Sequence, residues 1–164
     1  MFSGDKLFGS LQSGIIAGDK KMIQSIKESP LFRTYRCSPL TLFELQETTN
    51  KYVSKKEIEI PLWKMISMKY EDLENRIKSI SENLEIKHEF VRDNSVMGGG
   101  TLPNKSIASP VIQISELENK DLLSKLMRNE IPIIPRINKK NIIIDLRSTS
   151  EKNDIYIKDF FTKL

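Results

Sequence analysis

The sequence has little of several residue types that would identify a function at once. Its one cysteine, Cys37, excludes an internal disulfide, and its one histidine, His88, is too few for the usual His and Cys ligands of zinc or iron. No apolar run approaches the roughly 18 residues that a membrane helix needs, and the N-terminus lacks a secretory leader pattern. We therefore expect a cytoplasmic protein with no metal site and no membrane contact.

The rest of the composition is that of an ordinary folded protein. The chain has 164 residues, of which 38% are hydrophobic and 29% charged, enough for one domain or a small domain with an appendage. The net charge of +4 is local, because residues 19–56 hold eight Lys and Arg against four Asp and Glu. This basic segment can attract an anion or an RNA backbone, or it can simply be a solvated helical face.

The first fourteen residues are the most informative part of the chain. They place Lys6 among small residues and glycines, where Ser3 and Gly4 favour a tight turn, and Gly9 and Gly14 let the backbone pass close to something bulky and allow a positive φ. Lysines that form imines sit where burial and neighbouring groups make the amine a neutral nucleophile. On these residues alone, Lys6 is either such a lysine or a solvated surface residue.

The segment Ser3–Leu7, continued by Gly14–Gly18, resembles the pyridoxal-phosphate lysine segment of the bacterial selenocysteine synthase family, the L-seryl-tRNA(Sec) selenium transferases. The resemblance continues in the same order along the chain. It runs through the segments Pro30–Arg36, Pro39–Leu42, Ile60–Met65, Val96–Pro103, Pro132–Ile137 and Ile144–Arg147.

The resemblance implies a pyridoxal phosphate cofactor held by Lys6, with Ser3 and Asp5 as further cofactor-binding residues. It implies that the chain converts seryl-tRNA(Sec) to selenocysteinyl-tRNA(Sec), with selenophosphate as the selenium donor. After release from the cofactor, Lys6 is expected to serve as the acid and base that drives loss of the serine hydroxyl.

Arg33 and Arg36 are the candidate substrate-binding residues. They are three positions apart, so on a helix or turn both guanidinium groups can converge on one tetrahedral oxyanion. The resemblance implies that the matching arginines form the pocket for the selenium donor. On spacing alone, salt-bridged surface arginines are the alternative.

The chain is expected to be the C-terminal portion of such an enzyme, because the family's phosphate-binding loop and ring-contacting groups have no counterpart in it. Whether the chain alone is an enzyme is therefore open. We expect a homo-oligomer or a complementary N-terminal chain as partner, and no DNA. The alternatives are a non-catalytic remnant acting in RNA binding or oligomerisation, and another pyridoxal-phosphate lyase or transferase of fold type I.

Periodicity and turn residues give the expected secondary structure. We expect a strand over 14–18, a helix capped by Asp19 and ending near Pro30, and a second helix opened by the capping-box spacing of Thr41 and Glu44. An apolar stripe predicts a helix ending near Leu84, and a hairpin is expected over 133–146. The further expected elements are strands at 90–91 and 111–114, a glycine turn at 98–100, and helices over 122–127 and 155–164.

The order of elements predicts an α/β protein in two parts, and the resemblance implies that it belongs to the pyridoxal-phosphate enzymes of fold type I. Residues 1–57 are expected to be the remnant of the large cofactor-binding domain, carrying the lysine. Residues 58–164 are expected to form a small α+β C-terminal domain. Arg136 and Arg147, in the predicted hairpin, are either polar hairpin residues or groups that reach across a domain cleft.

Overall fold

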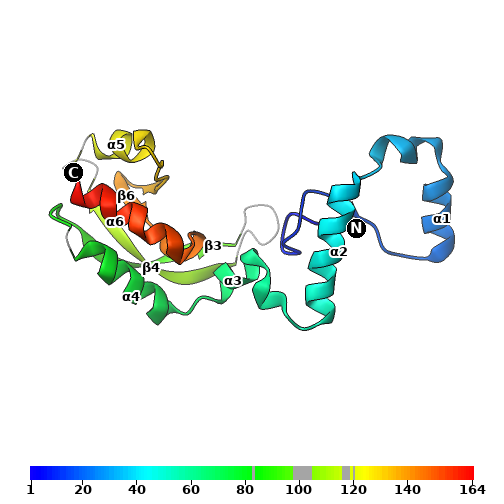
Figure 1. The fold of residues 1–164 in the computed structure, drawn as a ribbon, viewed down its shortest axis with the longest axis horizontal. Coiled ribbons are helices and arrows are strands. Elements are labelled where there is room, and N and C mark those ends of the chain that lie inside the picture. Colours follow the sequence, from blue (N-terminus) through cyan, green and yellow to red (C-terminus); the bar gives the residue numbers. More distant parts are fainter. Residues whose placement is uncertain (83, 98–104, 116–118, 120) are drawn as a thin grey trace. The chain divides into compact units, whose positions relative to one another are not determined.

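The structure of the chain is a computed structural model that describes residues 1–82, 84–97, 105–115, 119 and 121–164 (Figure 1). It mixes helices with antiparallel strands, in agreement with the predicted α/β class. The chain divides into two compact units, an N-terminal unit (Met1–Lys64) and a C-terminal unit (Met65–Leu164). The predicted glycine turn at 98–100 lies outside the described residues.

The N-terminal unit is mostly helical and has one short strand pair, in which Phe2 pairs with Ile15 and Ser3 with Gly14. The strand predicted over 14–18 is therefore limited to its first two residues. In chain order the elements are β1 (Phe2–Ser3), β2 (Gly14–Ile15), α1 (Lys20–Glu28), the 3-10 turn η1 (Pro30–Tyr35), α2 (Pro39–Val53), the 3-10 turn η2 (Glu57–Glu59) and α3 (Pro61–Ser67), which runs into the C-terminal unit.

Side-chain caps fix where the two longer helices of this unit begin. The Asp19 carboxylate accepts hydrogen bonds from the backbone N–H groups of Lys21 and Met22, as predicted. The predicted start of α2 at Thr41 was wrong, because the N-cap residue of this helix is Ser38. The Ser38 hydroxyl accepts from the Thr41 N–H, and Pro39 occupies the first helical turn, where its missing N–H costs nothing.

The N-terminal unit buries very little. Of its residues only Gly4, Thr48 and Ile60 are buried, although the unit is rich in large apolar side chains. Those exposed by 54% or more on its two long helices and on η1 are Met22, Leu31, Tyr35, Leu40, Leu42, Phe43 and Val53. A unit with so small a core gains little hydrophobic stabilisation from its own packing.

The C-terminal unit is built on a four-stranded antiparallel sheet with strand order β3-β4-β6-β5. Its elements are α4 (Tyr70–Ser81), β3 (Glu89–Val96), β4 (Ser106–Ser115), α5 (Leu122–Arg128), β5 (Arg136–Asn138), β6 (Asn141–Ile144), the 3-10 turns η3 (Leu146–Ser148) and η4 (Glu151–Asn153), and α6 (Asp154–Thr162). Helix α4 packs on β4 and on α6, so both helices cover one face of the sheet (Figure 1).

The predicted apolar stripe of α4 is the centre of this unit's core. Leu73 and Ile77 are fully buried against the central strands, where Ile112 and Ile142 are also inaccessible to solvent. The helix ends at Ser81, three residues before the predicted end, yet Leu84 is still buried in the same cluster. The apolar spacing therefore correctly predicted that Leu84 packs in the core, although Leu84 lies beyond the end of the helix.

The predicted hairpin is confirmed as β5 and β6, with shorter strands than expected. Asn138 pairs with Asn141, which leaves Lys139 and Lys140 as the two-residue turn, with φ values of 47° and 66°. Positive φ at both central residues is the geometry of a type I′ turn, whose twist matches that of the flanking strands. Lysine adopts it here without the glycine that usually occupies such a turn.

Arg147 is a buried structural arginine, which decides between the alternatives left open by the sequence. It follows β6 in η3, and its guanidinium donates to the carbonyl oxygens of Met68 at 2.9 Å and Ala108 at 2.8 Å. Longer bonds reach the carbonyls of Met65 and Ile66, at the end of α3. Burial lowers the pKa of the Arg147 guanidinium, and the Asp145 carboxylate opposes that shift. Arg147 thus ties the end of α3 to β4.

Two further observations bear on function classes. Within the described residues, no helix is long and apolar enough to cross a membrane. Within the same residues, no group of three or more His, Cys, Asp or Glu side chains lies close enough together to hold a metal ion.

We predict that Arg147→Met lowers the free energy of unfolding of the C-terminal unit by about 3 kcal/mol, because it leaves buried carbonyls without a donor. Amide hydrogen exchange in β4 measures this, with Arg128→Met as the control because Arg128 is exposed and its side chain makes no bond within the described part of the chain. Unchanged protection of β4 in Arg147→Met would contradict the structural role.

Candidate functional site

The lysine loop, residues 4–10, joins β1 to the segment that leads into β2. Its backbone closes on itself through two hydrogen bonds, from the Gly9 N–H to the Lys6 carbonyl at 2.9 Å and from the Ser10 N–H to the Gly4 carbonyl at 2.8 Å. The Gly4 N–H also donates to the Ser13 carbonyl at 2.9 Å, beside the β1–β2 pair. The loop therefore has a defined backbone although it contains no long strand or helix.

Two glycines are required in this loop for different reasons. Gly4 is buried, and a Cβ there would lie 2.7 Å from the Leu11 carbonyl oxygen. Gly9 has a φ of +75°, and its Cβ would lie 2.6 Å from Cγ2 of Ile60. Both positions need the close backbone approach that only glycine permits. The sequence prediction of close approach and positive φ thus holds at Gly9, whereas a Cβ at Gly14 would meet open space.

An aromatic cluster anchors the loop to α2 and α3. The Tyr52 hydroxyl donates to the Phe8 carbonyl at 2.9 Å, and its ring stacks on Phe8 with centroids 5.2 Å apart. The Trp63 indole N–H in turn donates to the Tyr52 oxygen at 2.6 Å. The sequence analysis missed this role of Tyr52, because nothing in the spacing along α2 marks a residue that bonds a backbone carbonyl 44 positions earlier.

The Lys6 side chain lies at the surface of this anchored loop. It is 51% exposed, and its ammonium group contacts the Asp5 carboxylate at 2.8 Å. The hydrogen bond from Lys6 lowers the pKa of the Asp5 carboxyl. Ser3 lies on β1 and is exposed. The structure therefore brings Lys6 and Asp5 together, while in the described part of the chain the Ser3 side chain forms no hydrogen bond with either of them.

Arg33 and Arg36 lie at the end of η1. Arg33 is in its last turn and Arg36 follows as the C-terminal flanking residue, and both are exposed. Within the described residues neither side chain has a hydrogen bond or an ion pair, so both guanidinium groups are available to a ligand. The described residues therefore do not show the alternative arrangement, in which Arg33 and Arg36 form salt bridges at the surface.

The remaining candidates of the sequence analysis have ordinary surroundings. Cys37 is half-buried and unpaired. The His88 ring bonds the Ile86 carbonyl through Nδ1 at 2.8 Å. Arg136 donates to the carboxylates of Asp93 at 3.0 Å and Asp145 at 3.2 Å, so it is a polar hairpin residue within the C-terminal unit.

The residues present fit one part of a pyridoxal phosphate site. An imine needs a neutral amine that an aldehyde can reach. The Lys6 amine on its defined backbone is accessible, but its exposure and its ion pair with Asp5 do not provide the burial that favours a neutral lysine. The cofactor also needs groups that fix its ring and anchor its phosphate. Besides Lys6, the polar side chains of the loop are the Asp5 carboxylate and the Ser10 hydroxyl, and Ser3 lies on β1 before it, so this chain fits the group as its covalent anchor.

Comparison with known proteins gives one consistent result. Residues 1–150 match the L-seryl-tRNA selenium transferase family (SelA). The L-seryl-tRNA(Sec) selenium transferase of Aliarcobacter butzleri is 39% identical over 169 aligned residues, which cover 99% of this chain and 37% of that protein. The proteins of the same name from Campylobacter lari and Alkaliphilus oremlandii are 38% and 34% identical and cover 93% and 97% of this chain.

The chain spans about a third of the length of the curated relatives it matches, since it covers 37%, 34% and 36% of these three. The similarity extends over both compact units, because the family match includes the lysine loop and continues to residue 150. The relatives therefore contain a large part that lies outside the matched segment.

We predict that Gly9→Ala destabilises the lysine loop by about 1–3 kcal/mol, through strain at a positive φ and a clash with Ile60. The emission of Trp63, the single tryptophan, reports this, because loss of its contact with Tyr52 should shift the emission to the red. Gly18→Ala is the matched control, since nothing lies within 4 Å of its Cβ position. Equal spectra for the two variants would rule out a tightly packed Gly9.

Proposed function

Because the chain belongs to the L-seryl-tRNA selenium transferase family, we propose that it supplies the lysine-bearing part of an enzyme that converts seryl-tRNA(Sec) to selenocysteinyl-tRNA(Sec). In this proposal Lys6 holds pyridoxal phosphate and selenophosphate is the selenium donor. The observation that carries it is the family match across a loop whose backbone is fixed while its lysine amine stays exposed.

Pyridoxal phosphate, when bound, supplies an electron sink for chemistry at the α-carbon of an amino acid. The chain's own contribution is positional. Tyr52 bonds the Phe8 carbonyl, two residues after Lys6, and Trp63 bonds the Tyr52 oxygen, so the backbone that follows the lysine is held in place. Asp5 accepts a hydrogen bond from that amine and can keep it oriented. Lys6, once released from the cofactor, is the group that moves a proton at the substrate's serine.

Arg33 and Arg36 are proposed to bind the phosphate-derived oxygens of the donor. Guanidinium groups offer several N–H donors in a planar fork, which suits tetrahedral oxyanions. Both side chains are exposed and lack protein partners in the described part of the chain, so no existing ion pair has to be broken on binding. Arg33 lies in the last turn of η1 and Arg36 directly follows η1, a spacing of three positions at which both can act on the same anion.

The N-terminal unit is proposed to be the remnant of a larger cofactor-binding domain of fold type I, and residues 58–164 the small C-terminal domain. The N-terminal unit has few buried residues and exposes apolar side chains on α1, η1 and α2. This supports the proposal, because an exposed apolar surface of this kind marks a site where another polypeptide packs. We propose that a complementary polypeptide, equivalent to the part that the relatives have in addition, packs on this surface. Assembly into a homo-oligomer belongs to the same proposal.

We predict that pyridoxal phosphate attaches covalently at Lys6. After incubation with the cofactor and reduction with borohydride, peptide mass spectrometry should find the modification at Lys6 in the native chain and lose it there in Lys6→Arg, because a guanidinium forms no imine. Lys21→Arg is the control, since Lys21 is an exposed lysine of the same unit. Labelling spread evenly over exposed lysines would contradict a cofactor-specific Lys6.

We further predict that Arg33→Gln with Arg36→Gln weakens inorganic phosphate or selenophosphate binding by about tenfold or more, since each lost charge-assisted hydrogen bond contributes about 1.5–3 kcal/mol. Isothermal titration calorimetry on the chain with its complementary polypeptide measures this. Lys51→Gln with Lys55→Gln removes the same charge from the same unit and should leave binding unchanged. Equal weakening in both double variants would mean only a general charge effect.

A further inference from the structure

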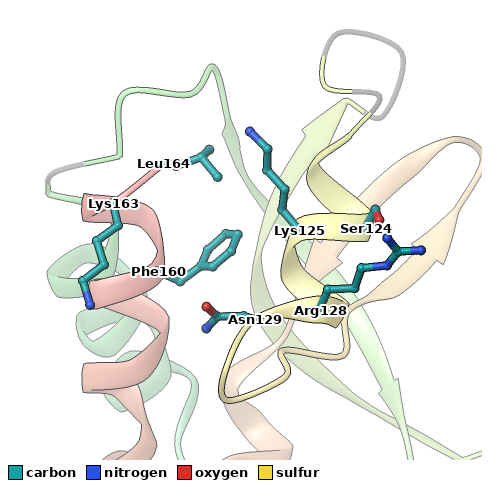
Figure 2. Close-up of a pocket in the computed structure, with 7 residues that line it drawn as sticks. All are labelled: Ser124, Lys125, Arg128, Asn129, Phe160, Lys163 and Leu164. Atoms are coloured by element: carbon teal, nitrogen blue, oxygen red, sulfur yellow. The ribbon is translucent and has the colours of Figure 1, made fainter.

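We propose that a basic pocket between α5 and α6 binds the phosphodiester backbone of an RNA strand. The pocket has a volume of about 510 Å³ and is lined by Ser124, Lys125, Arg128, Asn129, Phe160, Lys163 and Leu164 (Figure 2). It lies wholly in the C-terminal unit, whose residues the sequence analysis gave no role in ligand binding. The inference rests on the proposed function, since that function makes an RNA the substrate.

All the charged side chains that line the pocket are basic. Lys125, Arg128 and Lys163 are exposed, and no carboxylate side chain lines the pocket. Within the described residues none of the three cationic groups has a hydrogen bond or ion pair. Each is therefore free to neutralise an anion, and three neighbouring cationic side chains raise the local positive potential that attracts it.

The arrangement of the three cations favours a chain of phosphates over a single compact anion. Figure 2 shows Lys125 and Arg128 extending from α5 in different directions, while Lys163 extends from α6 on the other side of Phe160. Side chains that diverge in this way cannot all contact one phosphate ion. They can each contact a different phosphate along a strand, which is how sequence-independent nucleic-acid binding works.

The remaining lining residues suit the sugar and base parts of such a strand. The Asn129 side-chain N–H donates to the Ile131 carbonyl at 3.1 Å, which leaves its amide oxygen available as an acceptor. The 2′-hydroxyl of ribose is a donor that this oxygen and the Ser124 hydroxyl can recognise. Phe160 is only 8% exposed, so it provides an apolar floor and not an open stacking face.

A purely structural role for the same cations makes a different prediction. Lys125 and Arg128 lie in the last turn of α5, where positive charge complements the helix dipole. If that were their role, removing them would lower thermal stability slightly and leave RNA binding unchanged. The two roles are therefore separated by measuring RNA affinity and stability on the same variants.

The experiment measures binding of a fluorescently labelled tRNA(Sec) transcript to the full chain by anisotropy over a series of KCl concentrations. The pocket variant carries Lys125→Gln, Arg128→Gln and Lys163→Gln. The matched control carries Lys105→Gln, Lys140→Gln and Lys152→Gln, three exposed lysines of the same unit that do not line the pocket. A second control replaces Lys20, Lys21 and Lys27 of α1 by glutamine.

The pocket variant should bind the transcript at least about tenfold more weakly at low salt, with the slope of log Kd against log salt reduced by about one for each cation removed. Circular dichroism and the melting temperature should match those of the control. An unchanged slope, or an equal loss in either control variant, would overturn the pocket as the RNA site. Displacement of the transcript by inorganic phosphate at constant ionic strength would overturn it in favour of a compact anion.

Failure of this inference is distinguishable from failure of the proposed function. If the native chain binds the transcript and the pocket variant binds it equally well, only the pocket assignment is wrong. If the native chain does not bind the transcript at all, the pocket assignment is overturned, whereas the RNA substrate of the proposed enzyme is contradicted only if the chain with its complementary polypeptide also fails to bind. Cofactor attachment at Lys6 is measured without RNA and is independent of both results.

Discussion

The hydroxyl of Tyr52 is the contact on which the lysine loop depends. It donates to the Phe8 carbonyl and accepts from the Trp63 indole, so one oxygen joins the loop, α2 and α3. The glycines at positions 4 and 9 allow the loop backbone to lie close to Leu11 and to Ile60, where a Cβ would clash. The Lys6 amine is thus exposed while the backbone of its loop is held in place.

The two compact units differ in how they obtain stability. The C-terminal unit buries a continuous cluster from α4, α6 and the central strands, and two arginines satisfy buried backbone carbonyls around it. Arg76 bonds Asp154 through both carboxylate oxygens, at 2.8 and 2.7 Å, and also reaches the Leu146 carbonyl, near Arg147. The N-terminal unit has no comparable core. This imbalance supports the proposal that a further polypeptide completes the lysine-bearing part.

Sequence periodicity predicted which helices and strands form in the C-terminal unit better than it predicted the residues at which they begin and end. The stripe through Leu73 and Ile77 and the β5–β6 hairpin are confirmed, because burying one helical face and closing a two-residue turn depend on near neighbours in sequence. The predicted start of α2 was wrong because two candidate N-cap residues, Ser38 and Thr41, lie three residues apart. The hydroxyl of Ser38 forms the cap, and the pattern at Thr41 and Glu44 does not reveal that choice.

The sequence by itself determined the family, the lysine at the centre of the candidate site and the paired arginines of η1, because these depend on residue identity and order along the chain. Only the tertiary structure decided which residues hold the lysine loop and that Arg147 is a buried donor to four carbonyls. It also decided that Lys125, Arg128 and Lys163 line one pocket. These facts depend on contacts between residues far apart in sequence, whose spacing carries no periodic signal.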